Sequence, residues 1–90
     1  GKEALDLLKA WNTGHPGGIA TVHANSAYGG LTRLEQLISE VSTTNMSELI
    51  AEAVNLVVFI KKTNNGRKIK EIIKISGFNN ENKKYIFNQI

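Results

Sequence analysis

The residues best suited to chemistry lie in one short stretch, residues 14–25, which holds both histidines of the chain. A glycine-rich corner around Pro16 separates His15 from His23, because glycine accepts positive φ and proline ends a helix. An imidazole can carry a proton or bind a metal, and a neighbouring hydroxyl can hydrogen-bond a phosphate or a water. This stretch is therefore the first candidate for a functional site.

We expect residues 18–24 to form a short strand after the corner. Side chains alternate between the two faces of a strand, so Thr21 and His23 would point the same way. A hydroxyl and an imidazole on one face at a strand end suit a site that binds phosphate or water. The alternative is that His23 is a structural residue, held by a hydrogen bond within the fold.

A metal site would need a different arrangement of ligands. His15 and His23 are eight residues apart across the corner, whereas the paired histidines of helical zinc sites are one turn apart. Asp6 or Asn25 would have to complete the set, and no third acidic ligand is near in sequence. The chain also has no cysteine, which excludes disulfides and thiolate ligands. We expect no metal site.

The elements before and after the stretch must position it. Apolar residues at helical spacing predict a first helix over residues 2–13, with Trp11 in the core and Gly14 ending the helix. A second helix should begin with Asn25 or Ser26 as the N-cap.

Two further features belong to these helices. Gly29 and Gly30 in the first turn of the second helix indicate close approach of a strand or a ligand. Arg33 follows them and could reach a phosphate or a partner subunit, although a surface contact with Gln36 or Glu40 is the alternative. The pattern Asn45-x-x-Glu48 predicts a capping box for a third helix that ends near residue 54.

The C-terminal part of the chain has the pattern of a meander. Residues 56–60 are continuously apolar, which is typical of a buried strand, and Asn65-Gly66 is a strong hairpin signal. A two-residue turn there would place Ile60 opposite Glu71 and Val58 opposite Ile73. Residues 84–88 could add a third strand.

The net charge of +3 is unevenly distributed. Residues 1–60 carry three basic and six acidic side chains, whereas residues 61–90 carry eight basic and two acidic ones. The basic end could contact nucleic acid, anionic lipid or an acidic subunit, or it could be a solvated face whose lysines prevent edge pairing. One alternative function is therefore a small basic nucleic-acid-binding module built on the 56–75 hairpin. Phe59 is its one aromatic residue, so base stacking is poorly supported, and we expect no sequence-specific binding of nucleic acid.

Three parts of the sequence together resemble a known family: residues 4–13, the two-histidine stretch and residues 31–37. The chain resembles the C-terminal part of the TrbB-type conjugal transfer ATPases, which are hexameric motors of the type IV secretion branch of the secretion ATPases. The resemblance covers about residues 1–60 well and the remainder weakly. Gly14-His15 and Thr21-x-His23 look like the His box of that superfamily.

The resemblance implies an α/β fold, the C-terminal part of a RecA-like P-loop NTPase domain. It would contain three helices, one His-box strand that joins a parallel sheet, and a terminal antiparallel β-meander. His23 would approach the γ-phosphate of the nucleotide, His15 would be the first histidine of the box, and Thr21 and Arg33 would lie near the nucleotide.

The resemblance also implies cofactors and partners for the parent protein. ATP and Mg²⁺ would be its cofactors, and a homo-hexamer would work with the type IV secretion or conjugation machinery. That parent would be cytoplasmic and peripheral at the inner membrane. It would power conjugative DNA transfer or type IV secretion by ATP hydrolysis.

The sequence lacks the pattern Gly-x-x-x-x-Gly-Lys-Ser/Thr, which forms the phosphate-binding loop of such motors. The Walker A and Walker B regions would lie upstream, so we expect residues 1–90 to be a single partial domain of a larger motor. The isolated chain should be inactive as an ATPase and should self-associate through faces built to pack on other parts of the motor.

Overall fold

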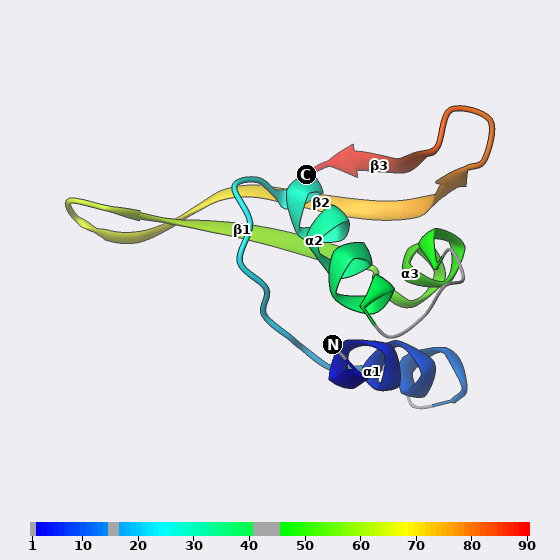
Figure 1. Ribbon diagram of the computed structural model, residues 1–90. Helices are drawn as coiled ribbons and strands as arrows, with labels where there is room; N and C mark the ends of the chain where they lie inside the picture. Colours follow the sequence, from blue (N-terminus) through cyan, green and yellow to red (C-terminus); the bar gives the residue numbers. More distant parts are fainter. Residues whose placement is uncertain (1, 15–16, 41–45) are drawn as a thin grey trace.

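The computed structural model describes residues 2–14, 17–40 and 46–90 (Figure 1). The helices are α1 (Lys2–Asn12), α2 (Ala27–Ser39) and α3 (Ser47–Ala53). The strands are β1 (Leu56–Thr63), β2 (Gly66–Asn79) and β3 (Lys84–Gln89). Helices α2 and α3 pack on one face of the sheet, and α1 packs on these two helices from the other side. None of the helices in the described residues is long and apolar enough to cross a membrane.

The three strands form one antiparallel sheet in the order β1-β2-β3, which confirms the predicted meander. Its long axis is the β1–β2 hairpin, whose tip projects well beyond the helices (Figure 1). No parallel strand pair occurs among the described residues, so a RecA-like sheet is not seen here.

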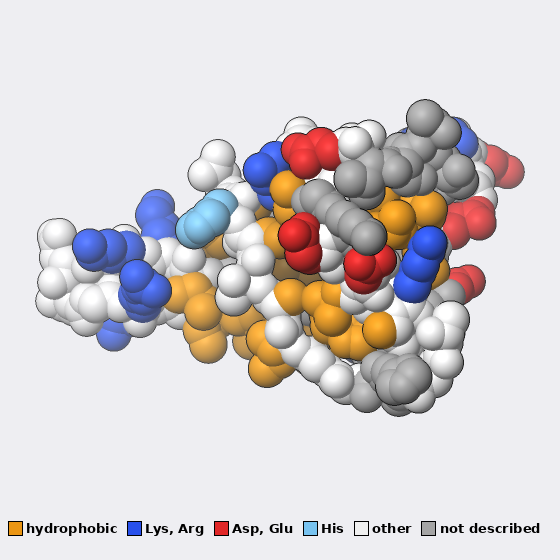
Figure 2. All heavy atoms as spheres, turned by 60° about the horizontal axis from the view of Figure 1, so that its bottom comes forward, with side chains coloured by type: hydrophobic (Ala, Val, Ile, Leu, Met, Phe, Trp, Pro, Cys, Tyr) orange, Lys and Arg blue, Asp and Glu red, His pale blue; other side chains and the backbone are white. Residues whose placement is uncertain are grey.

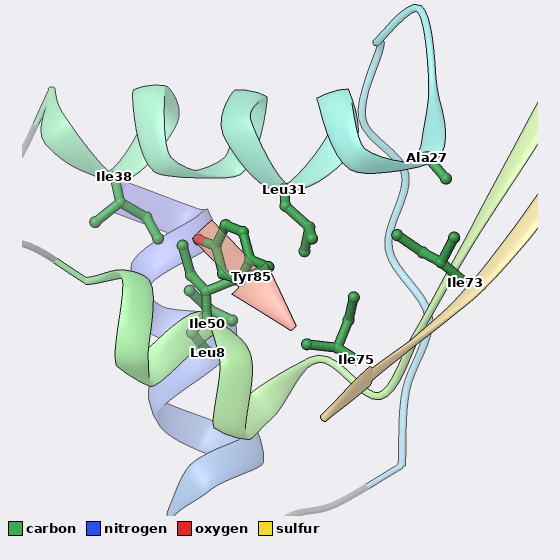
Figure 3. Close-up of a cluster of buried hydrophobic side chains, with 8 residues drawn as sticks. All are labelled: Leu8, Ala27, Leu31, Ile38, Ile50, Ile73, Ile75 and Tyr85. Carbon is green, nitrogen blue, oxygen red and sulfur yellow. The ribbon is translucent and has the colours of Figure 1, made fainter. Parts of the chain in front are cut away.

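The core lies between the sheet and the helices (Figure 3). Its buried side chains come from all three helices and from two strands: Leu8, Ala27, Leu31, Ile38, Ile50, Ile73, Ile75 and Tyr85. Each large aliphatic side chain buried here stabilises the fold by about 1.5–3 kcal/mol. Trp11 is partly buried against this cluster, as expected from its position in the first helix.

The start of α2 follows the sequence prediction. Ser26 is the N-cap, with an extended backbone, and its hydroxyl oxygen accepts a hydrogen bond from the Gly29 N–H at 2.9 Å. A Cβ atom at Gly30 would lie 3.4 Å from a methyl group of Val57 in β1. The close approach indicated by this glycine is therefore the approach of α2 to the sheet.

The start of α3 differs from the prediction. Met46 is its N-cap and makes no side-chain capping hydrogen bond, so the predicted capping box is not the start of this helix. Asn45, the predicted cap, lies outside the described residues. The Glu48 carboxylate instead accepts a hydrogen bond from the Asn80 side chain, after the end of β2.

The predicted pairing of β1 with β2 is also wrong, although the hairpin itself is confirmed. The turn residues are Asn64 and Asn65, and Thr63 pairs with Gly66. Gly66 has a φ of +99°, whereas neither asparagine has a positive φ. This is the pattern of a type I turn followed by a glycine bulge. With Gly66 counted, the loop has three residues, one more than the predicted two-residue Asn65-Gly66 turn.

A second irregularity, between Phe59 and Ile60, changes the register again. Phe59 lies opposite Glu71, where Ile60 was expected, and Val58 lies opposite Ile72. A shift of one residue exchanges the two faces of a strand. Val57 and Phe59 therefore pack toward the helices, and the other apolar side chains of β1 face away from them.

The expected His-box strand is not observed. Residues 17–24 form no strand pairing in the described part of the chain and cross from α1 to the start of α2 as an irregular segment (Figure 1). A strand requires a neighbour for its backbone groups. This segment instead runs over side chains, since Gly18 lies against the Trp11 indole and Val22 lies near Gly30.

Candidate functional site

The connecting segment, residues 17–24, holds two of the predicted site residues, Thr21 and His23, and both are exposed. His23 makes no hydrogen bond within the described part of the chain, so the hydrogen-bonded structural role considered for it is not what this structure has. An exposed imidazole and an exposed hydroxyl two residues apart can both donate to an anion. His15, the other predicted histidine, lies outside the described residues.

Gly18 constrains the path of the connecting segment. A Cβ atom at Gly18 would lie 2.6 Å from Nε1 of Trp11, so only glycine lets the chain pass over the indole ring. Further along, a Cβ atom at Gly30 would lie 3.8 Å from a methyl group of Val22, which is van der Waals contact. Val22 thus lies near α2 and is 40% exposed, and His23 follows it directly with its side chain in solvent.

Arg33, the third predicted site residue that the structure describes, lies in α2. It lies on the exposed surface of this helix, and its Nη1 donates a hydrogen bond to Oε1 of Gln36 at 3.3 Å. This is the surface contact that the sequence offered as the alternative to a phosphate contact. The structure therefore places Thr21 and His23 in the connecting segment and Arg33 in the helix that follows it.

The N-terminus of α2 lies at the end of the same segment, and three of its first four amide groups have partners within the chain. The Ala27 N–H donates to Oε1 of Glu71 at 2.9 Å, across 44 positions of sequence. The Gly29 and Gly30 amides bond to the side chain and backbone of Ser26. The Glu71 carboxylate also complements the positive end of the helix dipole. A protein carboxylate thus occupies the place where a phosphate could otherwise bind.

Glu71 was not recognised from the sequence as a functional residue. It is an acidic side chain within a run of isoleucines, at residues 69, 72, 73 and 75 of β2. A carboxylate in such a strand needs a partner if it faces the core. This need for a partner was the signal in the sequence. The predicted register, however, placed Glu71 opposite Ile60, whereas its neighbour in the structure is Phe59.

A second polar cluster also went unrecognised. The hydroxyl groups of Ser47 and Tyr85 both donate to Oε1 of Glu35, the first at 2.6 Å. The Tyr85 N–H donates to the Tyr28 hydroxyl at 3.0 Å, and the two rings meet edge to face. Burial, followed by the hydrogen bond to Glu35 and its negative charge, holds the pKa of Tyr85 far above its ordinary value. This cluster joins α2, α3 and β3 and is structural.

Two other features give no candidate site. Within the described ranges, no group of three or more His, Asp or Glu side chains could hold a metal ion. A shallow hollow between α3 and β2 is lined in part by Glu48, Glu52 and Ser76, and none of the predicted site residues lines it. The connecting segment remains the best candidate.

The chain matches one family model and several proteins of known families. The model for type II/IV secretion system proteins matches residues 1–85. The conjugal transfer protein TrbB of Rhizobium radiobacter is 54% identical over 77 residues, which is 86% of this chain and 24% of that protein. A protein of Sinorhizobium fredii (strain NBRC 101917 / NGR234), named "Probable conjugal transfer protein TrbB", shows the same identity and the same coverage. The chain thus spans about a quarter of the length of these relatives.

Proposed function

Because this chain belongs to the family of type II/IV secretion system proteins, we propose that it forms part of an ATP-driven motor for conjugal transfer or secretion. The observation that carries the proposal is the family match across residues 1–85, together with 54% identity to a conjugal transfer protein. The whole motor would be a homo-hexamer that works with the conjugation machinery at the cytoplasmic face of the inner membrane.

In this proposal the connecting segment is one side of a nucleotide site. Its exposed Thr21 hydroxyl and His23 imidazole can donate to phosphate oxygens. His23 would contact the γ-phosphate, and His15 and Arg33 would lie nearby as further members of the His-box side. ATP and Mg²⁺ would be held mainly by residues outside these 90, since the sequence contains no phosphate-binding loop.

The residues of this chain do not form a nucleotide site by themselves. No Gly-x-x-x-x-Gly-Lys-Ser/Thr pattern is present, and Glu71 and Ser26 already occupy three of the first four amides of α2. We therefore derive no hydrolytic step from this chain alone. Phosphate transfer requires a positioned metal ion and phosphate donors.

A chimera tests the proposal. The region of Rhizobium radiobacter TrbB that matches this chain would be replaced by this sequence, and ATP hydrolysis and conjugal transfer would be measured. We expect the chimera to retain both activities and the 90-residue chain to release no phosphate from ATP. A folded chimera without either activity, or hydrolysis by the chain alone, would contradict the proposal.

A second candidate function is the basic nucleic-acid-binding module on the 56–75 hairpin. The observation in its favour is that Lys61, Lys62, Arg67 and Lys68 are exposed near the tip of the hairpin. Phe59, the one aromatic residue of the hairpin, is partly buried against the core and is not available for base stacking. Binding of single-stranded DNA by the chain would test this alternative.

A further inference from the structure

The tip of the β1–β2 hairpin contains the dipeptide Asn65-Gly66, which has no role in the proposed function. Asn65 is the one asparagine in the sequence that glycine follows. The side-chain amide of an asparagine can react with the backbone nitrogen of the next residue. A glycine leaves that nitrogen unshielded because it has no Cβ. The tip is therefore a candidate site of chemical modification.

The structure leaves this dipeptide open to solvent. The tip projects beyond the helices (Figure 1), and Asn64, Asn65 and Gly66 are all exposed. Apart from the neighbouring residues, no atom lies within 4 Å of the position that a Cβ would take at Gly66. In the described part of the chain no hydrogen bond holds the Asn65 side chain. The two reacting groups are thus neither shielded nor tied to other residues through that side chain.

The turn between β2 and β3 also contains asparagines, but their side chains are held. Oδ1 of Asn79 accepts a hydrogen bond from the Glu81 N–H at 2.8 Å, and Oδ1 of Asn82 accepts one from the Lys84 N–H at 3.1 Å. Both asparagines are followed by residues that carry a Cβ. Asn65 differs from them in both respects.

Positive charge surrounds the dipeptide. Exposed cations lie on both sides of it in the hairpin: Lys61, Lys62, Arg67 and Lys68. The sequence has no acidic residue between Glu52 and Glu71, and Figure 2 shows basic side chains on the projecting hairpin. Attack of a nitrogen on an amide carbon places negative charge on the amide oxygen, which nearby cations stabilise. The charges at the tip therefore favour the reaction.

We propose that Asn65 is a site of spontaneous deamidation through a succinimide. The Gly66 nitrogen attacks Cγ of Asn65, and a new C–N bond closes a five-membered ring. The side-chain nitrogen leaves as ammonia and carries away the proton that the Gly66 nitrogen loses. Water then opens the ring at either carbonyl, which gives aspartate or isoaspartate. The reaction transfers no electrons and uses no nucleotide, so it is independent of the motor proposal.

Thr63 restrains this reaction in the folded chain. Its hydroxyl donates a hydrogen bond to the Gly66 carbonyl oxygen at 2.6 Å and accepts one from the Asn65 N–H at 3.3 Å. These bonds hold the backbone on both sides of the Asn65–Gly66 peptide bond, whereas ring closure requires rotation about the Asn65 Cα–C bond. The tip must therefore open first. Opening is local, because residues 64–66 contain no buried side chain.

The modification changes the tip in two ways. Either product replaces a neutral amide with a carboxylate, which lowers the net charge of the chain from +3 by one unit. Isoaspartate also adds one carbon to the backbone between Thr63 and Gly66, the residues that pair across the turn. The positive charge and the geometry of the tip are both altered.

The first test measures where and how fast the chain is modified. The unchanged chain is incubated at mildly alkaline pH without nucleotide, and mass spectrometry after proteolysis locates each conversion. We expect aspartate and isoaspartate at Asn65, at a rate within about tenfold of the rate in an unfolded peptide of residues 60–70. Reaction through global unfolding alone would be slower than in the peptide by about a thousandfold or more. Asn65→Gln should abolish the conversion, and Asn64→Gln is the matched control that should retain it.

The second test concerns the restraint by Thr63. Thr63→Val keeps the branched shape and removes the hydroxyl, so conversion at Asn65 should be at least about threefold faster than in the unchanged chain. Thr32→Val, at an exposed position of α2, is the control that should leave the rate unchanged. Circular dichroism of both variants shows whether the fold is retained.

Three results would overturn the proposal. The first is conversion at Asn65 that is more than tenfold slower than in the peptide. The second is conversion without any isoaspartate, which would mean direct hydrolysis of the side chain rather than a succinimide. The third is an equal rate in the folded Thr63→Val and Thr32→Val variants.

Discussion

Glu71 shows how a single side chain fixes the start of α2, the helix that directly follows the candidate site. Its carboxylate joins β2 to the first amide of α2 at 2.9 Å. The same carboxylate complements the helix dipole. The end of the connecting segment is thus tied to a residue far from it in sequence.

Two substitutions of Glu71 should separate the contribution of its hydrogen bond to stability from the contribution of its charge. Glu71→Ala leaves the Ala27 amide without its acceptor and should lower the free energy of unfolding by about 1–3 kcal/mol. Glu71→Gln keeps an acceptor oxygen and should cost about 0.3–1 kcal/mol, the dipole contribution alone. Urea denaturation measures both, with Glu81→Ala in the exposed turn as a control that should have little effect. Equal stability of the Glu71→Ala and Glu81→Ala variants would show that the bond contributes nothing.

Tyr85 should make stability depend on pH in the alkaline range. Burial, and then the hydrogen bond and charge of Glu35, raise the pKa of Tyr85 in the folded chain, whereas the unfolded chain titrates near its ordinary pKa. The stabilisation is complete below that ordinary value, about 10, and is lost as the pH rises above it, because only the unfolded state then releases the proton.

Because of Tyr85, the free energy of unfolding of the unchanged chain should be about 1.4 kcal/mol lower at pH 11 than at pH 8. Tyr85→Phe is the matched control, since lysine titration affects both proteins. Urea denaturation at several pH values should show a steeper decline for the unchanged chain. Parallel pH profiles for the two proteins would contradict the assignment.

At the scale of elements, the sequence predicted which helices and C-terminal strands form better than it predicted how the strands pair. The helices and the meander were predictable because apolar periodicity and the asparagine–glycine turn signals are local. The pairing of β1 with β2 was not, because a type I turn with a glycine bulge and the irregularity after Phe59 each shift it. The apolar face assigned to the hairpin was consequently the wrong one. The contact of Glu71 with α2 follows only from the correct register.

Gly66 is the residue that fixes the turn. Its φ of +99° is a conformation that other residues adopt at a cost of about 1–2 kcal/mol, so Gly66→Ala should lower the free energy of unfolding by that amount. Gly77, in the same strand, has no positive φ, and a Cβ there would lie 3.7 Å from Ile86, an ordinary contact. Gly77→Ala should therefore change stability by less than about 0.5 kcal/mol. If thermal unfolding shows the reverse order, the turn assignment is wrong.

At the scale of the whole molecule, the site was only partly predictable. The residue types between Gly14 and Asn25 indicated the connecting segment as the candidate, and Thr21 and His23 are exposed there. The strand expected for them is absent from the described residues, because alternation in a sequence does not supply a hydrogen-bonding neighbour. The position of Arg33 relative to His23 depends on tertiary packing, which spacing alone cannot give.

The proposed function treats the exposed connecting segment, carried by a small layer of helices and sheet, as one side of a nucleotide site. The central claim is that His23 contacts the γ-phosphate of ATP bound mainly by other residues of the motor. A group that meets this phosphate as it is transferred should stabilise the transition state more than the bound substrate.

The most direct measurement is steady-state ATP hydrolysis by the TrbB chimera that carries this sequence, with and without His23→Ala. We expect kcat to fall by at least about tenfold while KM changes by less than about threefold. Ile19→Ala is the control in the same segment, since Ile19 is 95% exposed and should be replaceable without effect. If His23→Ala has the same kcat as the Ile19→Ala control, His23 does not contact the phosphate and the account fails.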